Sequence, residues 1–99
     1  MKYFYDHETD ALSLVVTEFV GYAATEELAP NVVIYLDGKR NPLAVEIRNA
    51  SKLVDTAGLI PMDERAITGE EVKARLDATE VGQRVLRSLG RQPGLGARP

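Results

Sequence analysis

The sequence contains no cysteine, and this absence excludes several kinds of chemistry. Disulfide bonds, zinc sites with thiolate ligands and catalysis by a thiol all need the missing side chain. The lack of cysteine also suits a cytoplasmic protein, and the N-terminus agrees with that localisation. Acidic residues follow Lys2 too closely for a secretory signal peptide.

Long apolar segments are absent from the sequence as well. No run of apolar residues approaches the roughly 18 that a membrane-spanning helix needs, so we expect no membrane association. Histidine is scarce: His7 is the only one, and it lies beside Asp6, Glu8 and Asp10. Because a metal site usually draws ligands from more than one segment, we interpret these residues as an exposed polar turn and expect no metal or other cofactor.

Acidic residues are missing from the C-terminal end of the chain. All 15 lie at or before Glu80, so residues 1–83 carry a net charge of −7 and residues 84–99 a net charge of +4. This separation has two interpretations: the basic segment pairs with another chain or another copy, or Arg84 and Arg87 stabilise the negative end of a helix. The basic segment has no aromatic residue, so we do not expect nucleic-acid binding.

The first half of the chain has the alternation that is typical of β-strands. Apolar and polar residues alternate from Ala11 to Glu18, which predicts a strand with one buried face. Further strands are predicted at residues 2–5, 22–28, 32–36 and 42–48, and short turns join them in an antiparallel meander. One face of this sheet is apolar and consists of Leu12, Leu14, Val16, Ile34, Leu36, Leu43, Val45 and Ile47. Either the downstream helix or a second copy of the sheet must cover that face.

The stretch from Pro42 to Val54 joins the strands to the helical half of the chain. Asn49 ends the last strand, and Asn49 or Ser51 is expected to cap a short helical turn. Ser51 and Lys52 could be read as a nucleophile and its base. Adjacent residues on a helix do not face each other, however, so a cap is the better interpretation.

A helix is predicted to begin at Gly69, because Thr68 and Glu71 have the spacing of a capping box. Gly82 is expected to weaken the middle of the helical segment by about 1 kcal/mol relative to alanine. Gly90 is a suitable residue to end it.

The apolar residues of this segment do not fall on one side of a straight helix. Val72 lies on one side with Leu76, whereas Val81 lies on another with Val85 and Leu89. Two explanations are open. Either two surfaces cover one long helix, as in a dimer, or the helix breaks at residues 77–79, where Asp77 or Thr79 caps a second helix.

These patterns predict an α+β protein, in which an antiparallel meander of about five short strands precedes a C-terminal helical segment. Residues 1–90 are expected to form one domain, with the meander at 1–54, a connection at 55–67 and the helical segment at 68–90. Residues 91–99 are rich in glycine and proline, and we expect a disordered tail there.

No residues have the arrangement of a nucleophile and its base, so the catalytic equipment of most enzymes is not evident. The two-sided helical segment and the basic residues suggest an interaction surface instead, formed by Val72, Leu76, Val81, Arg84, Val85, Arg87 and Leu89. A weaker candidate is a polar site on the sheet. Glu26 and Glu46 could act there as acid and base, although Glu46 is expected to alternate outward to solvent.

The segment from Tyr3 to Val54 resembles a family of small, mostly prokaryotic proteins called domain of unknown function 2283. The resemblance is carried by three stretches: Tyr5-Asp6 with Asp10-Ala11-Leu12, then Thr25-Glu26-Glu27 with a break at Pro30, and finally Val45 to Lys52. Ser13 and Pro42 depart from the family pattern, where an aromatic and an aliphatic residue are usual. The resemblance implies no established activity. It suggests that some members are antitoxin-like partners of small toxin-like proteins encoded beside them.

We therefore expect a non-enzymatic interaction protein that forms a homodimer or a larger homo-oligomer, with a toxin-like protein as a further partner. The alternative is a small enzyme or ligand-binding module that uses the carboxylates of the sheet.

Overall fold

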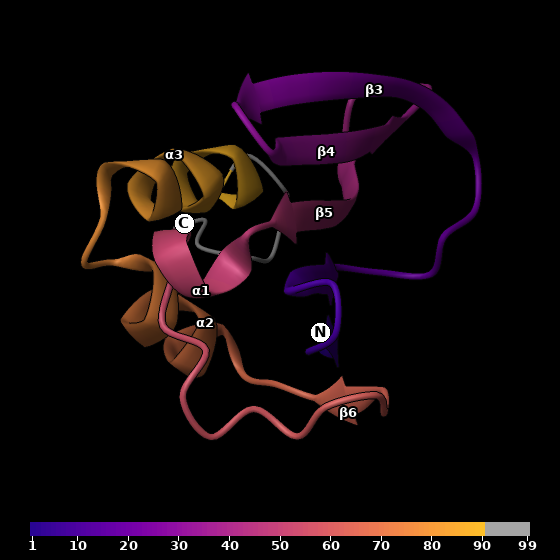
Figure 1. Ribbon diagram of the computed structural model, residues 1–99. Coiled ribbons are helices and arrows are strands. Elements are labelled where there is room, and N and C mark those ends of the chain that lie inside the picture. The colour runs from indigo at the N-terminus through magenta and orange to yellow at the C-terminus, as the bar shows by residue number, and fades with distance from the viewer. Residues whose placement is uncertain (91–99) are drawn as a thin grey trace.

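Six strands form a single antiparallel sheet, and three helices lie on one side of it, as the computed structural model shows for residues 1–90 (Figure 1). The strands are β1 (Lys2–Asp6), β2 (Ala11–Val15), β3 (Tyr22–Ala29), β4 (Val32–Asp37), β5 (Pro42–Arg48) and β6 (Arg65–Ala66). The helices are α1 (Ala50–Leu53), α2 (Gly69–Leu76) and α3 (Glu80–Leu89). This arrangement confirms the predicted α+β class, with the sheet first and the helices after it.

The strands do not follow one another across the sheet in chain order. The order is β3-β4-β5-β2-β1-β6, so β2 pairs with β5, and the connection to β3 crosses to the far edge. Leu12 lies opposite Ile47 and Leu14 opposite Val45 in this pairing. The pairing therefore joins two apolar rows that are more than 30 residues apart in sequence.

A sixth strand lies in the segment that was expected to be a connection. β6 is only two residues long and pairs with β1, so that Lys2 lies opposite Ala66. A hydrogen bond from the Met62 amide to the Tyr5 carbonyl holds the preceding loop along the same edge (2.8 Å). Two residues are too few to show an alternating pattern, which explains why the sequence did not indicate this strand.

The helical segment breaks into two helices, and this resolves the alternative that the sequence left open. The Thr68 hydroxyl caps α2 by accepting a hydrogen bond from the Glu71 amide (3.1 Å). The Thr79 hydroxyl caps α3 by accepting one from the Gly82 amide (3.0 Å). With a change of direction between them, both helices direct their apolar residues to the same core.

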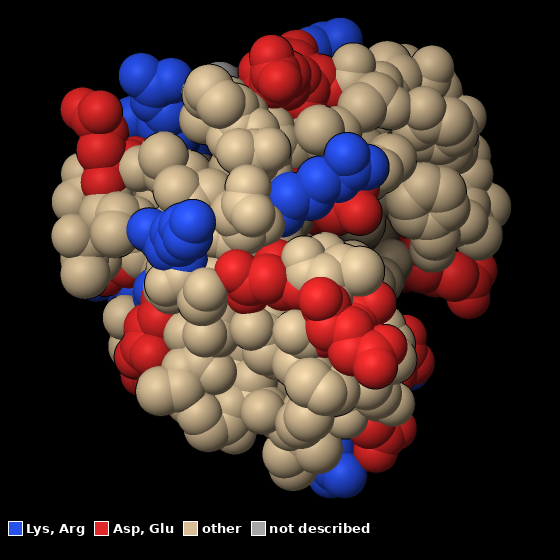
Figure 2. Space-filling view, in the orientation of Figure 1, with Lys and Arg blue, Asp and Glu red and all other residues tan. Residues whose placement is uncertain are grey.

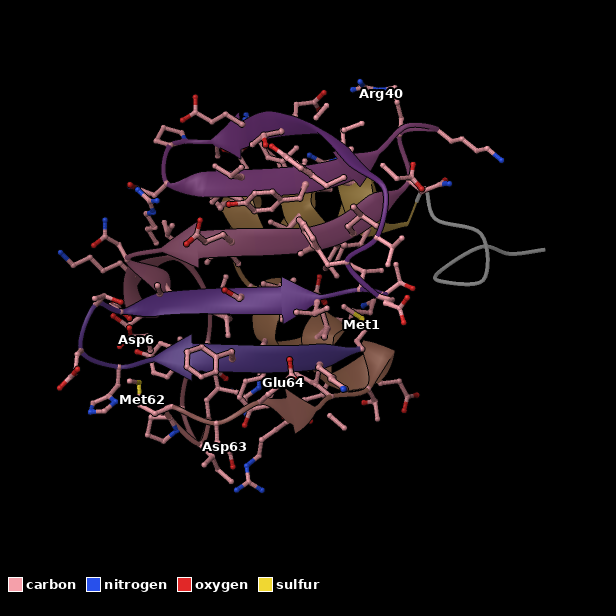
Figure 3. All side chains as sticks on the ribbon, turned by 90° about the vertical axis from the view of Figure 1, so that its right-hand side faces the viewer. Met1, Asp6, Arg40, Met62, Asp63 and Glu64 are labelled. Atoms are coloured by element: carbon pink, nitrogen blue, oxygen red, sulfur yellow. The ribbon has the colours of Figure 1, made fainter. Side chains whose placement is uncertain are left out.

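The helices cover one face of the sheet, and no helix within residues 1–90 covers the other. Figure 3 looks onto the uncovered face, and all three helices lie behind the strands. The covered face forms the core together with Val72, Leu76, Val85 and Leu89, which are at most 3% exposed. Val16, which was expected in the apolar row, is only half-buried, whereas the other seven residues of that row are buried.

The carboxylate of Asp10 ties the β1–β2 hairpin to the start of α1. It accepts hydrogen bonds from the Ser51 hydroxyl (2.7 Å), the Ser51 amide (3.1 Å) and the Tyr5 hydroxyl (2.7 Å). The carbonyl of Asp10 also accepts from the Ala50 amide (2.9 Å). The bonds between Asp10 and Ser51 connect residues 41 positions apart in the sequence.

The cap of α1 therefore differs from the one expected at Asn49 or Ser51. Asn49 adopts a left-handed conformation (φ 55°) but makes no side-chain cap hydrogen bond. Ser51 donates its hydroxyl to Asp10 instead of capping the turn. The acceptor at the start of α1 therefore comes from another segment of the chain. It is a carboxylate, which binds amide donors more strongly than a neutral side chain does.

These contacts shift two ionisation equilibria in opposite directions. The Ser51 hydroxyl, together with the Tyr5 hydroxyl and the Ser51 amide, lowers the pKa of Asp10 below its ordinary value, and only desolvation opposes them. The hydrogen bond to Asp10 raises the pKa of Tyr5. A carboxylate whose pKa is lowered by folding stabilises the fold while it is ionised.

We predict that Asp10→Asn lowers the free energy of unfolding at pH 7 by about 1 kcal/mol, because an amide oxygen replaces a charged acceptor. Asparagine tolerates the left-handed conformation of residue 10 (φ 56°), so the change isolates the charge. The contribution of Asp10 is complete above the unfolded pKa of about 4 and is lost as the pH falls through the lower folded pKa. Urea denaturation of both proteins between pH 7 and pH 3 should show the difference shrinking below about pH 4. A constant difference would contradict this role.

Gly82 has a different role from the one its sequence position suggested. It is buried in the first turn of α3, directly against the end of α2. A Cβ atom built at this position would lie 1.8 Å from the carbonyl oxygen of Leu76, which is backbone and cannot move aside. Gly82 therefore permits the tight turn between the two helices instead of merely weakening a helix.

We predict that Gly82→Ala destabilises the protein by about 1–3 kcal/mol, although alanine is the better helix former by about 1 kcal/mol. Gly38→Ala is the matched control, because a Cβ atom there has nothing within 4 Å. Midpoints of urea denaturation for both variants measure the effect. A Gly82→Ala protein as stable as the control would show that the turn has room for a side chain.

Candidate functional site

The uncovered side of the sheet, which we call the outer face, carries two rows of side chains. Strand register places the first row in the order Lys2, Val15, Ala44, Tyr35, Thr25 from β1 to β3. The second row, in the same direction, is Phe4, Ser13, Glu46, Val33, Glu27. The outer face is therefore a mixture of apolar and polar side chains, and none of the helices in the described part of the chain lies over it (Figure 3).

Three aromatic rings gather at the β3–β4 corner of the outer face. The ring of Phe19 stacks on that of Tyr22, with centroids 5.6 Å apart, and each of these rings lies 5.8 Å from the ring of Tyr35. Phe19 is 50% exposed and Tyr22 is 51% exposed. This aromatic cluster presents large apolar area to solvent, which is characteristic of surfaces that bind a partner.

Tyr35 also connects the cluster to the polar centre of the outer face. Its hydroxyl donates a hydrogen bond to the Glu46 carboxylate (3.2 Å), which lies 3.8 Å from the guanidinium of Arg48. Partial burial and the nearby Glu46 carboxylate raise the pKa of Tyr35 above its ordinary value. Glu46 therefore belongs to an ordered hydrogen-bond network on the outer face.

A hollow of about 570 Å³ lies on the other half of the outer face, toward β6. Val15, Lys2 and Ala66 line it, and the ion pair between Lys2 and Glu64 (3.5 Å) lies at its side. Phe19 lines its border with the aromatic cluster. The outer face thus has an aromatic half and a hollowed half, and Phe19 belongs to both.

Both edges of the sheet are poorly suited to pairing with another strand. The outermost strand, β3, has register shifts near both ends, and its central residues include Glu26 and Glu27. The Arg84 guanidinium donates a hydrogen bond to the Leu28 carbonyl (3.2 Å), so this backbone acceptor of β3 already has a partner. At the opposite edge β6 has only two residues. Bulges, charges and short strands are common protections of sheet edges.

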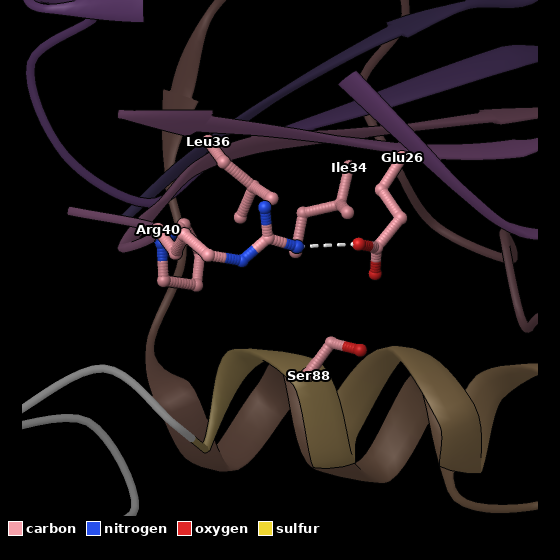
Figure 4. Close-up of a pocket in the computed structure, with 6 residues that line it drawn as sticks. Glu26, Ile34, Leu36, Arg40 and Ser88 are labelled. Atoms are coloured by element: carbon pink, nitrogen blue, oxygen red, sulfur yellow. Dashed lines mark hydrogen bonds and ion pairs between the residues drawn. The ribbon is translucent and has the colours of Figure 1, made fainter. Parts of the chain in front are cut away.

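The two carboxylates proposed as a joint polar site lie on opposite faces of the sheet. Glu46 is on the outer face, whereas Glu26 pairs with Ile34 and points toward α3. Glu26 forms an ion pair with Arg40 (2.6 Å) at the mouth of a cavity of about 180 Å³, and Ser88 lines the cavity from the helix side (Figure 4). The structure does not bring Glu26 and Glu46 together, so they cannot act as an acid–base pair on one substrate.

The helical residues proposed as an interaction surface are placed mostly in the core. Val72, Leu76, Val85 and Leu89 are buried, and Val81 is half-buried against them. They cover the sheet of the same chain, because the break between α2 and α3 lets both helices reach it. Arg84 and Arg87 are exposed on α3.

Charges of both signs share one side of the molecule. Acidic and basic side chains are interspersed over the side of the molecule in Figure 2. Several form ion pairs within the chain, such as Arg75 with Glu71 (3.2 Å) on α2. Arg91 and Arg98, which contribute half of the basic segment, lie outside the described residues.

Two further observations concern the described part of the chain. Within residues 1–90 no three histidine, aspartate or glutamate side chains are grouped so that they could hold a metal ion. None of the helices in this range is long and apolar enough to cross a membrane.

Sequence reasoning missed the aromatic cluster, because its rings come from three separate places in the chain. Phe19 and Val20 lie in the turn between the predicted strands at 11–18 and 22–28, and both are at least 50% exposed. Two large apolar residues in a turn were the available signal, since turns are usually polar.

Comparisons with known proteins give one positive result. A family model described as "Protein of unknown function (DUF2283)" matches residues 2–51. Comparisons with curated proteins and with solved structures found no match. The matched segment begins at β1 and ends at Ser51, so it contains both ends of the Asp10–Ser51 contact. It also spans half of the chain, and the protein therefore belongs to the DUF2283 family.

Proposed function

We propose that this protein is a non-enzymatic interaction module and that its outer face is the surface through which it self-associates. The observation that carries the proposal is the uncovered sheet face with Phe19 and Tyr22 half-exposed at one corner. Exposed aromatic side chains of this kind supply binding energy when a partner removes them from water. Their stacked arrangement limits the conformational entropy that binding would cost.

We predict that Phe19→Ser with Tyr22→Ser weakens self-association at least about tenfold, because two aromatic anchors are lost. Both side chains are half-exposed, so the fold should tolerate the change. Sedimentation equilibrium between about 1 µM and 1 mM gives the dissociation constants. Ile60→Ser is the matched control. Ile60 is 43% exposed, and its amide donates a hydrogen bond to the hydroxyl of Tyr3, whose side chain points into the core and away from the outer face.

Two results would count against the proposal. A wild-type protein that stays monomeric over the whole concentration range would exclude self-association. Equal weakening by the Ile60→Ser control would show that general surface hydrophobicity, and not the outer face, causes the association.

A toxin-like protein encoded beside the gene is the heterologous partner that the family resemblance suggests. Co-expression of the two products followed by affinity purification tests this, with the Phe19→Ser, Tyr22→Ser variant as the matched comparison. Recovery of the neighbouring product with the wild type but not with the variant would assign the interaction to the outer face. Recovery with neither protein would exclude that partner.

A second candidate function is ligand binding at the cavity beside Glu26. The cavity favours this function because Ile34, Leu36 and Pro42 provide apolar walls, while Glu26, Arg40 and Ser88 provide polar groups. The interaction proposal predicts that a thermal-shift screen with divalent metals and common metabolites leaves the unfolding temperature unchanged. A compound that raised it by several degrees in the wild type, but not in Glu26→Gln, would favour the ligand-binding function instead.

A further inference from the structure

We propose that the partner on the outer face is a second copy of this chain, packed face to face about a two-fold axis that runs parallel to the strands. This inference rests on the proposed function and specifies its geometry. The aromatic cluster of each copy would then enter the hollow of the other.

The first argument is the shape of the outer face. The aromatic cluster is half-exposed at the β3–β4 side, and the hollow lies at the β2–β1–β6 side, both next to the row that runs from Lys2 to Thr25. A two-fold axis parallel to the strands reverses the strand order and keeps positions along the strands. It therefore places the aromatic cluster of each copy over the hollow of the other. The two contacts are equivalent, as an isologous interface requires.

The second argument is the chemistry of the residues that this operation brings together. With the axis between β5 and β2, Val33 faces the partner's Phe4. Ala44 lies opposite the partner's Val15, but it is only 9% exposed and adds little contact. Tyr35 faces the partner's Lys2, so that an ammonium group meets an aromatic ring. Glu46 faces the partner's Ser13, which can donate a hydrogen bond to the carboxylate.

Other ways of joining two copies are less favourable. An axis across the strands at the level of Glu46 would place this residue on the partner's Glu46, and like charges brought together oppose association. An axis midway between the two rows would place the Glu46 carboxylate over the partner's Ala44, which offers it no hydrogen-bond donor. Pairing of two β3 edges meets the register shifts, the two glutamates and the Arg84 contact on that strand.

The size of the outer face predicts a weak dimer. Six strands about 4.8 Å apart and roughly five or six residues long give about 400–500 Å² per copy. Twice this area is close to the lower limit of about 1,000 Å² for specific interfaces. At the rim, Glu27 approaches the partner's Glu64, which weakens the contact further. We expect a dissociation constant in the micromolar range and a dimer that depends on concentration.

The absence of cysteine allows a direct test. The axis parallel to the strands places Thr25 on β3 over the partner's Ala66 on β6, and both residues are exposed. Facing sheets lie about 10 Å apart, so a short bismaleimide suits the gap better than a disulfide bond. The variants Thr25→Cys and Ala66→Cys are prepared separately. The reagent is then added to three samples, which are each variant by itself and an equal mixture of the two. All samples are at a concentration where the wild type is dimeric.

The expected result is a cross-linked dimer in the mixture, with at least about fivefold less in either variant alone. Cross-linking of Thr25→Cys alone, at a yield equal to the mixture, would overturn the geometry in favour of edge pairing. A mixture that does not cross-link, while sedimentation still shows dimers that the Phe19→Ser, Tyr22→Ser change weakens, would overturn the geometry but leave the proposed function intact. A wild type that is monomeric throughout would overturn both.

Discussion

The structure depends on how much of the sheet the apolar side chains of the helices can cover. A six-stranded sheet has two faces, and the helices α2 and α3 are sufficient for one of them. Val72, Leu76, Val85 and Leu89 are placed on that face, and each is almost completely buried. The break between the helices makes this possible, because a straight helix would have turned half of these residues away from the sheet. The outer face is what this arrangement leaves without a cover.

Polar contacts hold together elements of the fold that apolar packing alone would not fix. Asp10 joins the first hairpin to α1, and Thr79 both caps α3 and donates its hydroxyl to the Leu53 carbonyl (2.7 Å). Each of these groups connects segments that are distant in sequence. The hydrogen bonds of Asp10 thus join the beginning of the family segment to its end at Ser51. The later helices are attached to this segment by contacts such as the one from Thr79 to Leu53.

Local patterns were sufficient to predict the parts of the fold that local forces determine. The alternating strands and the cap at Thr68 follow from short stretches of sequence, and Thr79 was one of the two residues predicted to cap a second helix. The pairing of β2 with β5, the strand β6 and the Asp10–Ser51 contact depend on residues that meet only in the folded chain. The aromatic cluster was missed for the same reason, because Phe19, Tyr22 and Tyr35 belong to a turn and two strands.

The strand order has a consequence for how the chain reaches this structure. The hairpins β3–β4 and β4–β5 have short loops, so their pairing closes few residues and is entropically inexpensive. The pairing of β2 with β5 must close a much longer loop, since Ala11 meets Arg48. We expect a three-stranded unit of β3, β4 and β5 to form early and the β1–β2 hairpin to dock on it later. The hydrogen bonds between Asp10 and Ser51 would then be among the last native contacts to form, and their appearance would mark the completion of the sheet.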